Sequence, residues 1–316
     1  MLEEADFELP KVILTALEIL HIGLRLVNFT YERINRIAED STTNVDRFRK
    51  HYGVDHFVAA QMFEDLQITE IEEARLDENK ISIKYYLIAM HFVKVYDVEG
   101  RREPIFDLSP KTMREWVWYY VEKIQNLKHE KIVWPDDYLA DDVWIASVDT
   151  TDCPIEEKTH PTLSQDSELF SFKINGAGLR CEYAIDLFSS RIIWMNGPFL
   201  PGVYNDNTIF AEKGLKEKLA AIGKKVLGDK IYNGHPEECS TFNALDTKPV
   251  KIMKARIQMR HEQFNNMVKS FNVMKHAFRH KPNKIEKHKM CFEAVTVICC
   301  YRMEHGEPLF DLLAGL

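Results

Sequence analysis

Apolar side chains recur at helical spacing through the first 140 residues. Apolar runs with few helix breakers cover residues 12–37, 57–66 and 81–95, and runs of this length favour helices over strands. Ser109 followed by Pro110 is typical of a helix start and predicts a helix through Ile124. We therefore predict an all-helical N-terminal region over residues 1–140.

The pattern changes near residue 140, where Pro135 and the acidic segment DDYLADD predict a domain boundary. Beyond it, short runs rich in β-branched and aromatic residues predict strands. A first strand is expected to end at Asp149, and another short buried strand is expected to end at Asp229. The other expected elements are strands over 179–186 and 191–197, a helix over 206–222, and a long helix that follows Pro249 and ends near Pro282.

The order of these elements is strand, strand, strand, helix, strand, helix. Such an alternation belongs to the α/β class. We therefore predict a ribonuclease-H-like mixed sheet flanked by helices over residues 141–316, preceded by the all-helical region.

Three carboxylates at these positions match the needs of phosphodiester cleavage by two divalent metal ions. Asp149 and Asp229 are expected at strand ends, and Glu262 is expected in the middle of the long helix. Carboxylates placed in this way can meet at one edge of a sheet, where Mg²⁺ or Mn²⁺ activates the attacking oxygen and stabilises the leaving oxygen. We therefore predict these three residues as catalytic residues and metal ligands.

The helix that carries Glu262 has an apolar stripe, because apolar residues recur every seven positions at Ile257, Phe264, Phe271 and Phe278. At about 100° per residue, Glu262 lies about 160° from Phe264. It shares a polar face with Gln258, Asn265, Asn266 and Lys269. That face can line a site, although an exposed glutamate on a solvated helix face has the same spacing.

Two further aspartates compete for the metal site and are kept as accessory ligands. Asp152 follows Asp149 by three positions, so in a continued strand only one of the two side chains would reach the metals directly. Asp206 opens an expected helix, and a role as its N-cap is the simpler explanation. A zinc site remains a minor alternative, with a spacing that matches no common zinc pattern; its residues are His276, His280, His288 and Cys291.

Charge is distributed unevenly along the chain, whose formal net charge is −8. Residues 1–148 contain 18 Lys/Arg and 28 Asp/Glu, a net of −10, whereas residues 248–289 contain 12 Lys/Arg and 2 Asp/Glu, a net of +10. A concentrated basic segment is the footprint of a protein that binds the phosphate backbone of nucleic acid, although a solvated helix face gives the same count.

Other features limit the class of protein. We find no run of 18 apolar residues, so we expect no membrane-spanning helix. Six scattered cysteines without a CxxC pair indicate reduced thiols in a nuclear or cytosolic protein. The segment FDLSPKTMREWVWYYVEKI resembles a helix-turn-helix, but its Trp and Tyr content favours a structural bundle.

Several segments of residues 143–316 together resemble the PIF/Harbinger family of DDE transposases. The family patterns around the three catalytic acids are similar to VDTTDCPIEE, GDKIYNG and MRHEQFNNMVKSF, which point to Asp149, Asp229 and Glu262. Further similar segments are FSFKING (170–176), IIWMNGPFLPGVYNDNTIF (192–210, with Asp206 on a family aspartate) and FRHKPNKIEKHKMCFEAVTVICCYRMEHGEPLF (278–310). The order of the segments carries the resemblance, because each one alone is a weak signal.

The resemblance implies a nuclear enzyme, with the cytoplasm as the alternative location, that cuts and joins DNA strands with Mg²⁺ or Mn²⁺. It also implies a homo-oligomer and a separate Myb-like DNA-binding partner protein. The aligned positions that would contact DNA are Lys173, Arg260, Asn265 and Lys269.

The chain departs from the family pattern beside the acids. Thr150 and Ile231 stand where glycines are usual, Phe172 replaces a histidine, and Asn266 with Met267 replaces a Gly-Arg pair. A β-branched side chain at a glycine position disfavours a positive φ. These departures motivate an alternative: a domesticated or inactive transposase-derived protein that binds DNA or another protein.

Overall fold

The computed structural model describes residues 13–72, 82–135, 138–139, 141–156, 167–241, 243, 246–280 and 284–312. The chain divides into two compact units, Met1–Ile124 and Gln125–Leu316. Val12, Ile81 and Pro282, which bound predicted helices, lie outside the described residues.

All the regular elements described in the first unit are helices, as the apolar spacing predicts. Their bounds are α1 Ala16–Leu26, α2 Tyr31–Asn35, α3 Thr42–Tyr52, α4 His56–Glu72, α5 Ile83–Val95 and α6 Glu99–Phe106, followed by α7 Pro110–Asn126, which crosses into the second unit. Ser109 accepts a hydrogen bond from the Thr112 amide at 3.2 Å, which confirms it as the cap of α7.

The division between the units falls after Ile124, earlier than the predicted boundary near residue 140. Gln125 and Lys128, the latter on the short helix α8 (Lys128–Lys131), donate hydrogen bonds to Glu293 at 2.6 and 2.5 Å. Glu293 belongs to α13 (Lys284–Glu304) in the core of the second unit. These contacts attach the segment after Ile124 to the second unit, and the change of composition near Pro135 does not reveal them.

The second unit contains a mixed sheet of six described strands, β1 Trp144–Pro154, β2 Phe170–Ser171, β3 Gly176–Asp186, β4 Ile192–Phe199, β5 Lys225–Leu227 and β6 Cys239–Ser240. β3 pairs antiparallel with β1, β2 and β4, whereas β5 runs parallel to β1 and β6 runs parallel to β5. Hence the predicted mixed sheet of an α/β unit is confirmed.

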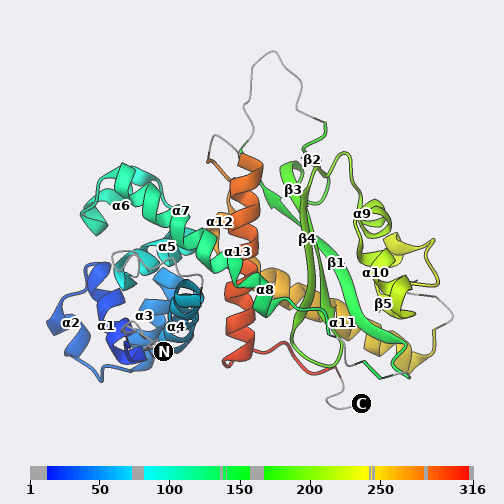
Figure 1. Cartoon of the computed structure of the whole chain (residues 1–316), viewed down its shortest axis with the longest axis horizontal. Coiled ribbons are helices and arrows are strands. Elements are labelled where there is room, and N and C mark those ends of the chain that lie inside the picture. The colour runs from blue at the N-terminus through cyan, green and yellow to red at the C-terminus, as the bar shows by residue number, and fades with distance from the viewer. Residues whose placement is uncertain are drawn as a thin grey trace, which may run out of the picture. The chain divides into compact units, whose positions relative to one another are not determined.

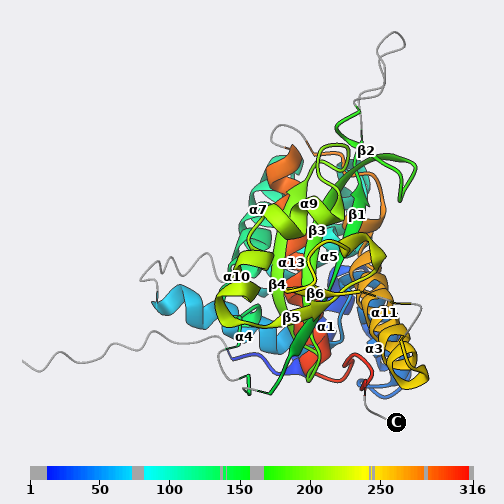
Figure 2. The same cartoon turned by 90° about the vertical axis from the view of Figure 1, so that its right-hand side faces the viewer.

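Helices cover both faces of this sheet (Figure 1). One layer is formed by α9 (Asp206–Glu212) and α10 (Leu215–Ile222), and the other by α11 (Lys248–Lys269) and α13. Figure 2, viewed from the side of α9 and α10, shows the strands between the two layers. A 3₁₀ turn, η1 (Lys230–Tyr232), follows β5, and α12 (Asn272–Lys275) follows α11.

Alternate residues of β1 serve the two layers. Ala146 and Val148 belong to a core cluster with Phe210 of α9 and Leu219 of α10. Ser147, on the opposite face, contacts α11, where its hydroxyl lies 2.8 Å from His261 Nε2. Because neighbouring side chains of a strand alternate between its faces, Asp149 shares the α11 face with Ser147.

Three predicted elements differ from those observed. β1 does not end at Asp149, because antiparallel pairing with β3 continues to Pro154. The predicted helix over 206–222 is interrupted at Gly214, whose φ of 106° is incompatible with a continuous helix. The long helix ends at Lys269, yet Phe271 and Phe278 beyond it are fully buried, as the stripe predicts.

None of the described helices is long and apolar enough to span a membrane. All six cysteines lie in the described ranges, where they are buried and form no disulfide. Their redox state in the cell stays a prediction.

Candidate functional site

Asp149 lies where β1 passes the end of its parallel neighbour. The pairing of β1 with β5 ends at Ser147 and Leu227, while its pairing with β3 continues on the other side. A carboxylate two positions beyond the last parallel pair has no β5 backbone beside it. The chain after β5 turns through Asp229 into η1 next to this opening.

The three predicted catalytic acids line one cavity of about 510 Å³. Asp149 comes from β1, Asp229 from the turn after β5, and Glu262 from α11. Asp149 and Asp229 also lie close enough for the charge of Asp229 to raise the pKa of Asp149. Residues far apart in the sequence are thereby brought to one opening, as the order of elements predicts.

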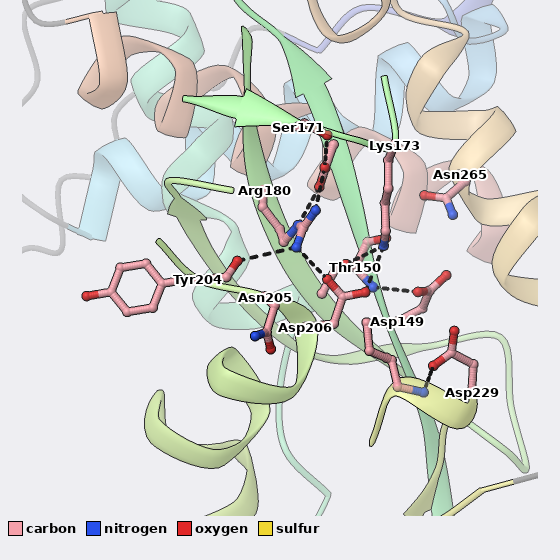
Figure 3. A network of polar contacts seen from close by, with 12 residues as sticks. Asp149, Thr150, Ser171, Lys173, Arg180, Tyr204, Asn205, Asp206, Asp229 and Asn265 are labelled. Carbon is pink, nitrogen blue, oxygen red and sulfur yellow. Dashed lines mark hydrogen bonds and ion pairs between the residues drawn. The ribbon is translucent and has the colours of Figure 1, made fainter. Parts of the chain in front are cut away.

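The three carboxylates have different surroundings. Asp149 is half-buried and accepts a hydrogen bond from the Thr150 amide at 2.7 Å, whereas Asp229 and Glu262 are exposed. Asp229 caps η1 by accepting a hydrogen bond from the Ile231 amide at 2.8 Å. Figure 3 shows Asp149 and Asp229 with these bonds. Among the residues described, Glu262 forms no side-chain hydrogen bond or ion pair, so it is the least restrained of the three acids.

Burial raises the pKa of Asp149 to about 6. The positive charge of Lys173 and the hydrogen bond from Thr150 oppose this rise, while the charges of Asp206 and Asp229 add to it. A carboxylate in such a place is costly to ionise unless a cation lies near it. A cation in the cavity would, like Lys173, stabilise the ionised form of Asp149.

The described residues nevertheless contain no group of three or more His, Cys, Asp or Glu side chains placed to hold a metal ion. The donor chemistry fits Mg²⁺ or Mn²⁺, which take carboxylate oxygens. The side-chain positions fit only in part, because the three acids line one cavity without closing around one point. Side-chain rotation of Asp229 and Glu262 would be needed, and exposed side chains change rotamer readily.

The opposite face of β1 holds a second set of acids, which are paired. Asp152 accepts two hydrogen bonds from Arg180, each of 2.7 Å, and one from the Ser171 hydroxyl. Arg180 also pairs with Asp206 at 2.8 Å, and Lys173 donates to Asp206 at 2.9 Å. We call these contacts the Arg180 network and define it as Asp152, Ser171, Lys173, Arg180 and Asp206. Figure 3 shows it with Ser171, Lys173, Arg180 and Asp206 labelled.

Membership of the Arg180 network changes two expectations. Asp152 and Asp206 are buried in ion pairs and do not line the three-acid cavity, so the expectation that they are accessory metal ligands is not supported. The expectation that Asp206 caps its helix is wrong, because Asn205 is the N-cap and accepts from the Thr208 amide at 2.9 Å. Asp206 occupies the first helical position, where its carboxylate faces Arg180 and Lys173.

The four residues expected to contact DNA have different environments. Arg260 is buried and donates to the carbonyl oxygens of Leu187 and Ser189, at 3.3 and 2.5 Å, so it holds a turn and cannot serve as a surface phosphate contact in this structure. Lys173 is 40% exposed but tied to Asp206 and Thr150. Asn265 accepts a hydrogen bond from Tyr183 at 2.5 Å, and Lys269 is half-buried near Cys153. For Lys173, Asn265 and Lys269, contact with DNA stays a prediction.

Sequence reasoning missed Lys254, which lines the three-acid cavity from α11. Its ammonium group is buried and bonds to Thr241 O at 2.6 Å and Asp246 Oδ2 at 2.8 Å. A signal was available, since Lys254, Gln258 and Glu262 recur every four positions and therefore share one helix face. The same cavity also contains Met259 and His261.

His261 lies beside Glu262 but faces inward. It is buried, stacks on Tyr183 with ring centroids 5.5 Å apart, and contacts the Ser147 hydroxyl. Burial lowers the pKa of His261 to about 3, so the ring is neutral at physiological pH. The residue thus joins α11 to β1 and fixes the side of the helix from which Glu262 projects.

Two departures from the family pattern are accommodated without backbone strain. Thr150 and Ile231 are absent from the described non-glycine residues with positive φ. Thr150 is buried, and its hydroxyl accepts a hydrogen bond from Lys173 at 2.8 Å, while Ile231 lies in η1. Phe172 is 90% exposed, so its ring lies on the surface of the unit.

Comparisons with known proteins add no constraint: no family model, no curated protein and no solved structure matches this chain. The case for a function therefore depends on the cavity, its charges and the neighbouring surfaces.

Proposed function

We propose that this chain is a Mg²⁺- or Mn²⁺-dependent nuclease of the DDE transposase type, built on a ribonuclease-H-like sheet. The observation that carries the proposal is that Asp149, Asp229 and Glu262, from three separate elements, line one cavity. The strand arrangement supports it, because β1, β3 and β4 pair antiparallel and are followed by a helical crossover to strands parallel to β1. On this proposal the nucleic acid is DNA.

The three acids would hold the ions, which supply activation of the attacking oxygen and stabilisation of the leaving oxygen. The chain's own contribution is placement. His261 fixes the rotation of α11 through Ser147, and η1 fixes the backbone of Asp229. Basic residues of α11 that remain exposed, Lys248 and Lys251, provide positive charge on the helix that carries Glu262. A homo-oligomer, a nuclear location and a separate Myb-like DNA-binding partner belong to the same proposal.

The test is cleavage of end-labelled DNA oligonucleotides, single-stranded and duplex, with Mg²⁺ or Mn²⁺. We expect Asp149→Asn and Glu262→Gln each to lower the cleavage rate by roughly a hundredfold or more, because metal-ion stabilisation contributes several kcal/mol to the barrier. Glu286→Gln is the matched control, since Glu286 is also an exposed helical glutamate of the second unit but does not line the cavity. Equal cleavage by the wild type and Asp149→Asn would refute the proposal.

A second candidate function is a transposase-derived protein that binds DNA or a protein partner without cleaving. The observation in its favour is that the acids are not gathered into a metal-holding group among the described residues. A thermal-shift titration with Mn²⁺ separates the two candidates. A rise in Tm that disappears in Glu262→Gln supports the nuclease, and no rise in the wild type supports the binding protein.

A further inference from the structure

A second cavity, of about 760 Å³, adjoins the three-acid cavity. The two share Leu227 and Lys254 as lining residues. The second cavity continues from there past η1 and β6 to Trp144 at the start of β1. Its volume lies in the range of pockets that hold small organic molecules, roughly 300–1,000 Å³. If a DNA strand lies in the three-acid cavity, the adjoining cavity has room for one of its nucleotides.

Trp144 offers this cavity an aromatic surface. The side chain is 44% exposed, although an indole of a core strand would ordinarily be covered. Its Nε1 donates to Ser240 Oγ at 2.9 Å, so the polar atom of the indole already has a partner within the chain. A ligand can therefore contact only the flat surface of the Trp144 ring. Such a surface stacks on any planar base, whatever hydrogen-bonding groups the base carries.

The polar lining of the cavity suits a nucleotide. Lys230 lines it next to Asp229 in the sequence and forms no ion pair among the residues that the structure describes. The charges of Lys254 and Asp246 cancel, because the two residues form an ion pair. The net positive charge of the cavity lining therefore comes from Lys230. The Oδ1 atom of Asn233 accepts a hydrogen bond from the Thr241 hydroxyl, and its amide NH₂ can donate to the edge of a base. A cationic group near the acids and an aromatic ring further away match the phosphate-to-base direction of a nucleotide.

We propose that this cavity binds an unpaired or extruded nucleotide of the DNA strand that is cleaved, with its base on Trp144 and its phosphate near Lys230. A base inside a duplex is covered by its stacking neighbours and cannot enter a concave pocket, so the nucleotide must be unpaired. The inference rests on the proposed function and specifies its substrate: single-stranded or locally opened DNA close to the scissile phosphate.

The test measures binding without cleavage. A fluorescein-labelled single-stranded 15-mer is titrated with the full chain in the absence of divalent metal, and anisotropy gives the Kd; the oligomer length is on the order of one protein footprint on single-stranded DNA. We expect Trp144→Ala to raise the Kd about tenfold, as the loss of one base–aromatic stack does, and Trp144→Phe to stay within about threefold of wild type. Trp144→Phe also loses the bond to Ser240, so it separates stacking from that bond.

Phe188→Ala is the matched control, because Phe188 is 61% exposed and lines neither cavity. A fully paired 15-mer duplex should bind the wild type more weakly than the single strand does. The Kd of the duplex should be the same for the wild type and for Trp144→Ala. The inference is overturned if Trp144→Ala changes the Kd no more than Phe188→Ala does, or if the Trp144→Ala effect is the same on duplex and single strand. Circular dichroism and melting of each variant exclude loss of fold as the cause.

The outcome of this experiment is independent of the cleavage test. If Trp144→Ala weakens single-strand binding but no preparation cleaves DNA with metal, the nuclease proposal fails and the nucleotide pocket remains. If cleavage depends on Asp149 and Glu262 while Trp144→Ala binds and cleaves like the wild type, the pocket fails and the nuclease remains.

Discussion

The acids on the two faces of β1 differ in whether they form ion pairs. On the α11 face, Asp149 shares a cavity with Asp229 and Glu262, and no ion pair to any of the three is present among the residues described. On the α9 face, Asp152 is neutralised by Arg180, which also binds Asp206. Asp149 and Asp152 are separated by only two residues, so the difference arises from which helix layer each side chain faces.

This difference separates acids that stabilise the fold from acids that are available for chemistry. A buried carboxylate that is fully paired cannot accept a metal ion without releasing its cation, whereas an unpaired carboxylate at a cavity gains from a bound cation. We therefore expect changes on the α9 face to alter mainly stability and changes on the α11 face to alter mainly metal response and activity.

The largest effect on stability is expected for Arg180→Met. Asp152 and Asp206 stay buried in this variant, but both lose their ion pair with Arg180. Asp206 keeps its ion pair with Lys173. Breaking a buried pair from one side costs about 3–5 kcal/mol. The free energy of unfolding is measured by urea denaturation, and unfolding is monitored by a signal that reports on the second unit.

Arg191→Met is the control for the loss of an arginine, because the Arg191 side chain is exposed and, among the residues described, hydrogen-bonds only to Ser189. Its effect should stay within about 0.5 kcal/mol. If both variants unfold at the same urea concentration, the Arg180 network does not hold the α9 face together.

The next effect in size is a pH dependence from Glu182, which faces the same side as Asp152. Glu182 is fully buried on β3, and burial raises its pKa to about 8, while the hydrogen bond from Trp194 Nε1 at 3.0 Å opposes the rise. Because the folded pKa lies above the ordinary value of 4.5, the contribution of Glu182 to stability is complete below about pH 4.5 and is lost as the pH rises through 8.

We therefore expect Glu182→Gln to remove part of the decrease in wild-type stability between pH 5 and pH 8.5, a difference of a few kcal/mol at most. The measurement is the urea midpoint of both proteins across this range. Glu217→Gln, at an exposed glutamate of α10, should give a curve parallel to that of the wild type. A Glu182→Gln curve that is also parallel to the wild type would show that Glu182 is ionised in the fold.

Which parts of the fold and site follow from the sequence can be seen at Asp149 and Asp152. The apolar run before Asp149 predicts a strand, and the order of elements predicts that Asp149, Asp229 and Glu262 come to one opening; the structure places all three around one cavity. β1 extends past its predicted end at Asp149, because its last residues pair with β3, a contact between distant segments. Local hydrophobic spacing carries no information on such pairing.

The fate of each acid depends on partners that are remote in sequence. Asp152 is paired by Arg180, 28 positions away, and Asp206 by Lys173, 33 positions away. Nothing in the segment VDTTD distinguishes the paired acid from the unpaired one. Likewise, the composition of α11 shows that Arg260 is basic but not that it binds the carbonyl groups at Leu187 and Ser189 from inside the unit.

The smallest effect on stability, and the sharpest test of the contrast between faces, is expected for Asp149→Asn. Asparagine can accept the same hydrogen bond from the Thr150 amide. It loses the attraction of Lys173, but it also removes the larger cost of desolvating the charge and the repulsion from Asp206 and Asp229. We therefore expect the variant to be as stable as the wild type or more stable, by about 1 kcal/mol at neutral pH, a gain of the kind that accompanies loss of function at active sites.

The matched substitution on the other face, Asp152→Asn, should destabilise, because it leaves Arg180 without one of its two acids. Addition of Mn²⁺ should raise the Tm of the wild type and Asp152→Asn but not of Asp149→Asn. If Asp149→Asn instead loses as much stability as Asp152→Asn, then Asp149 is a structural acid like its neighbour, and the distinction between the two faces of β1 does not hold.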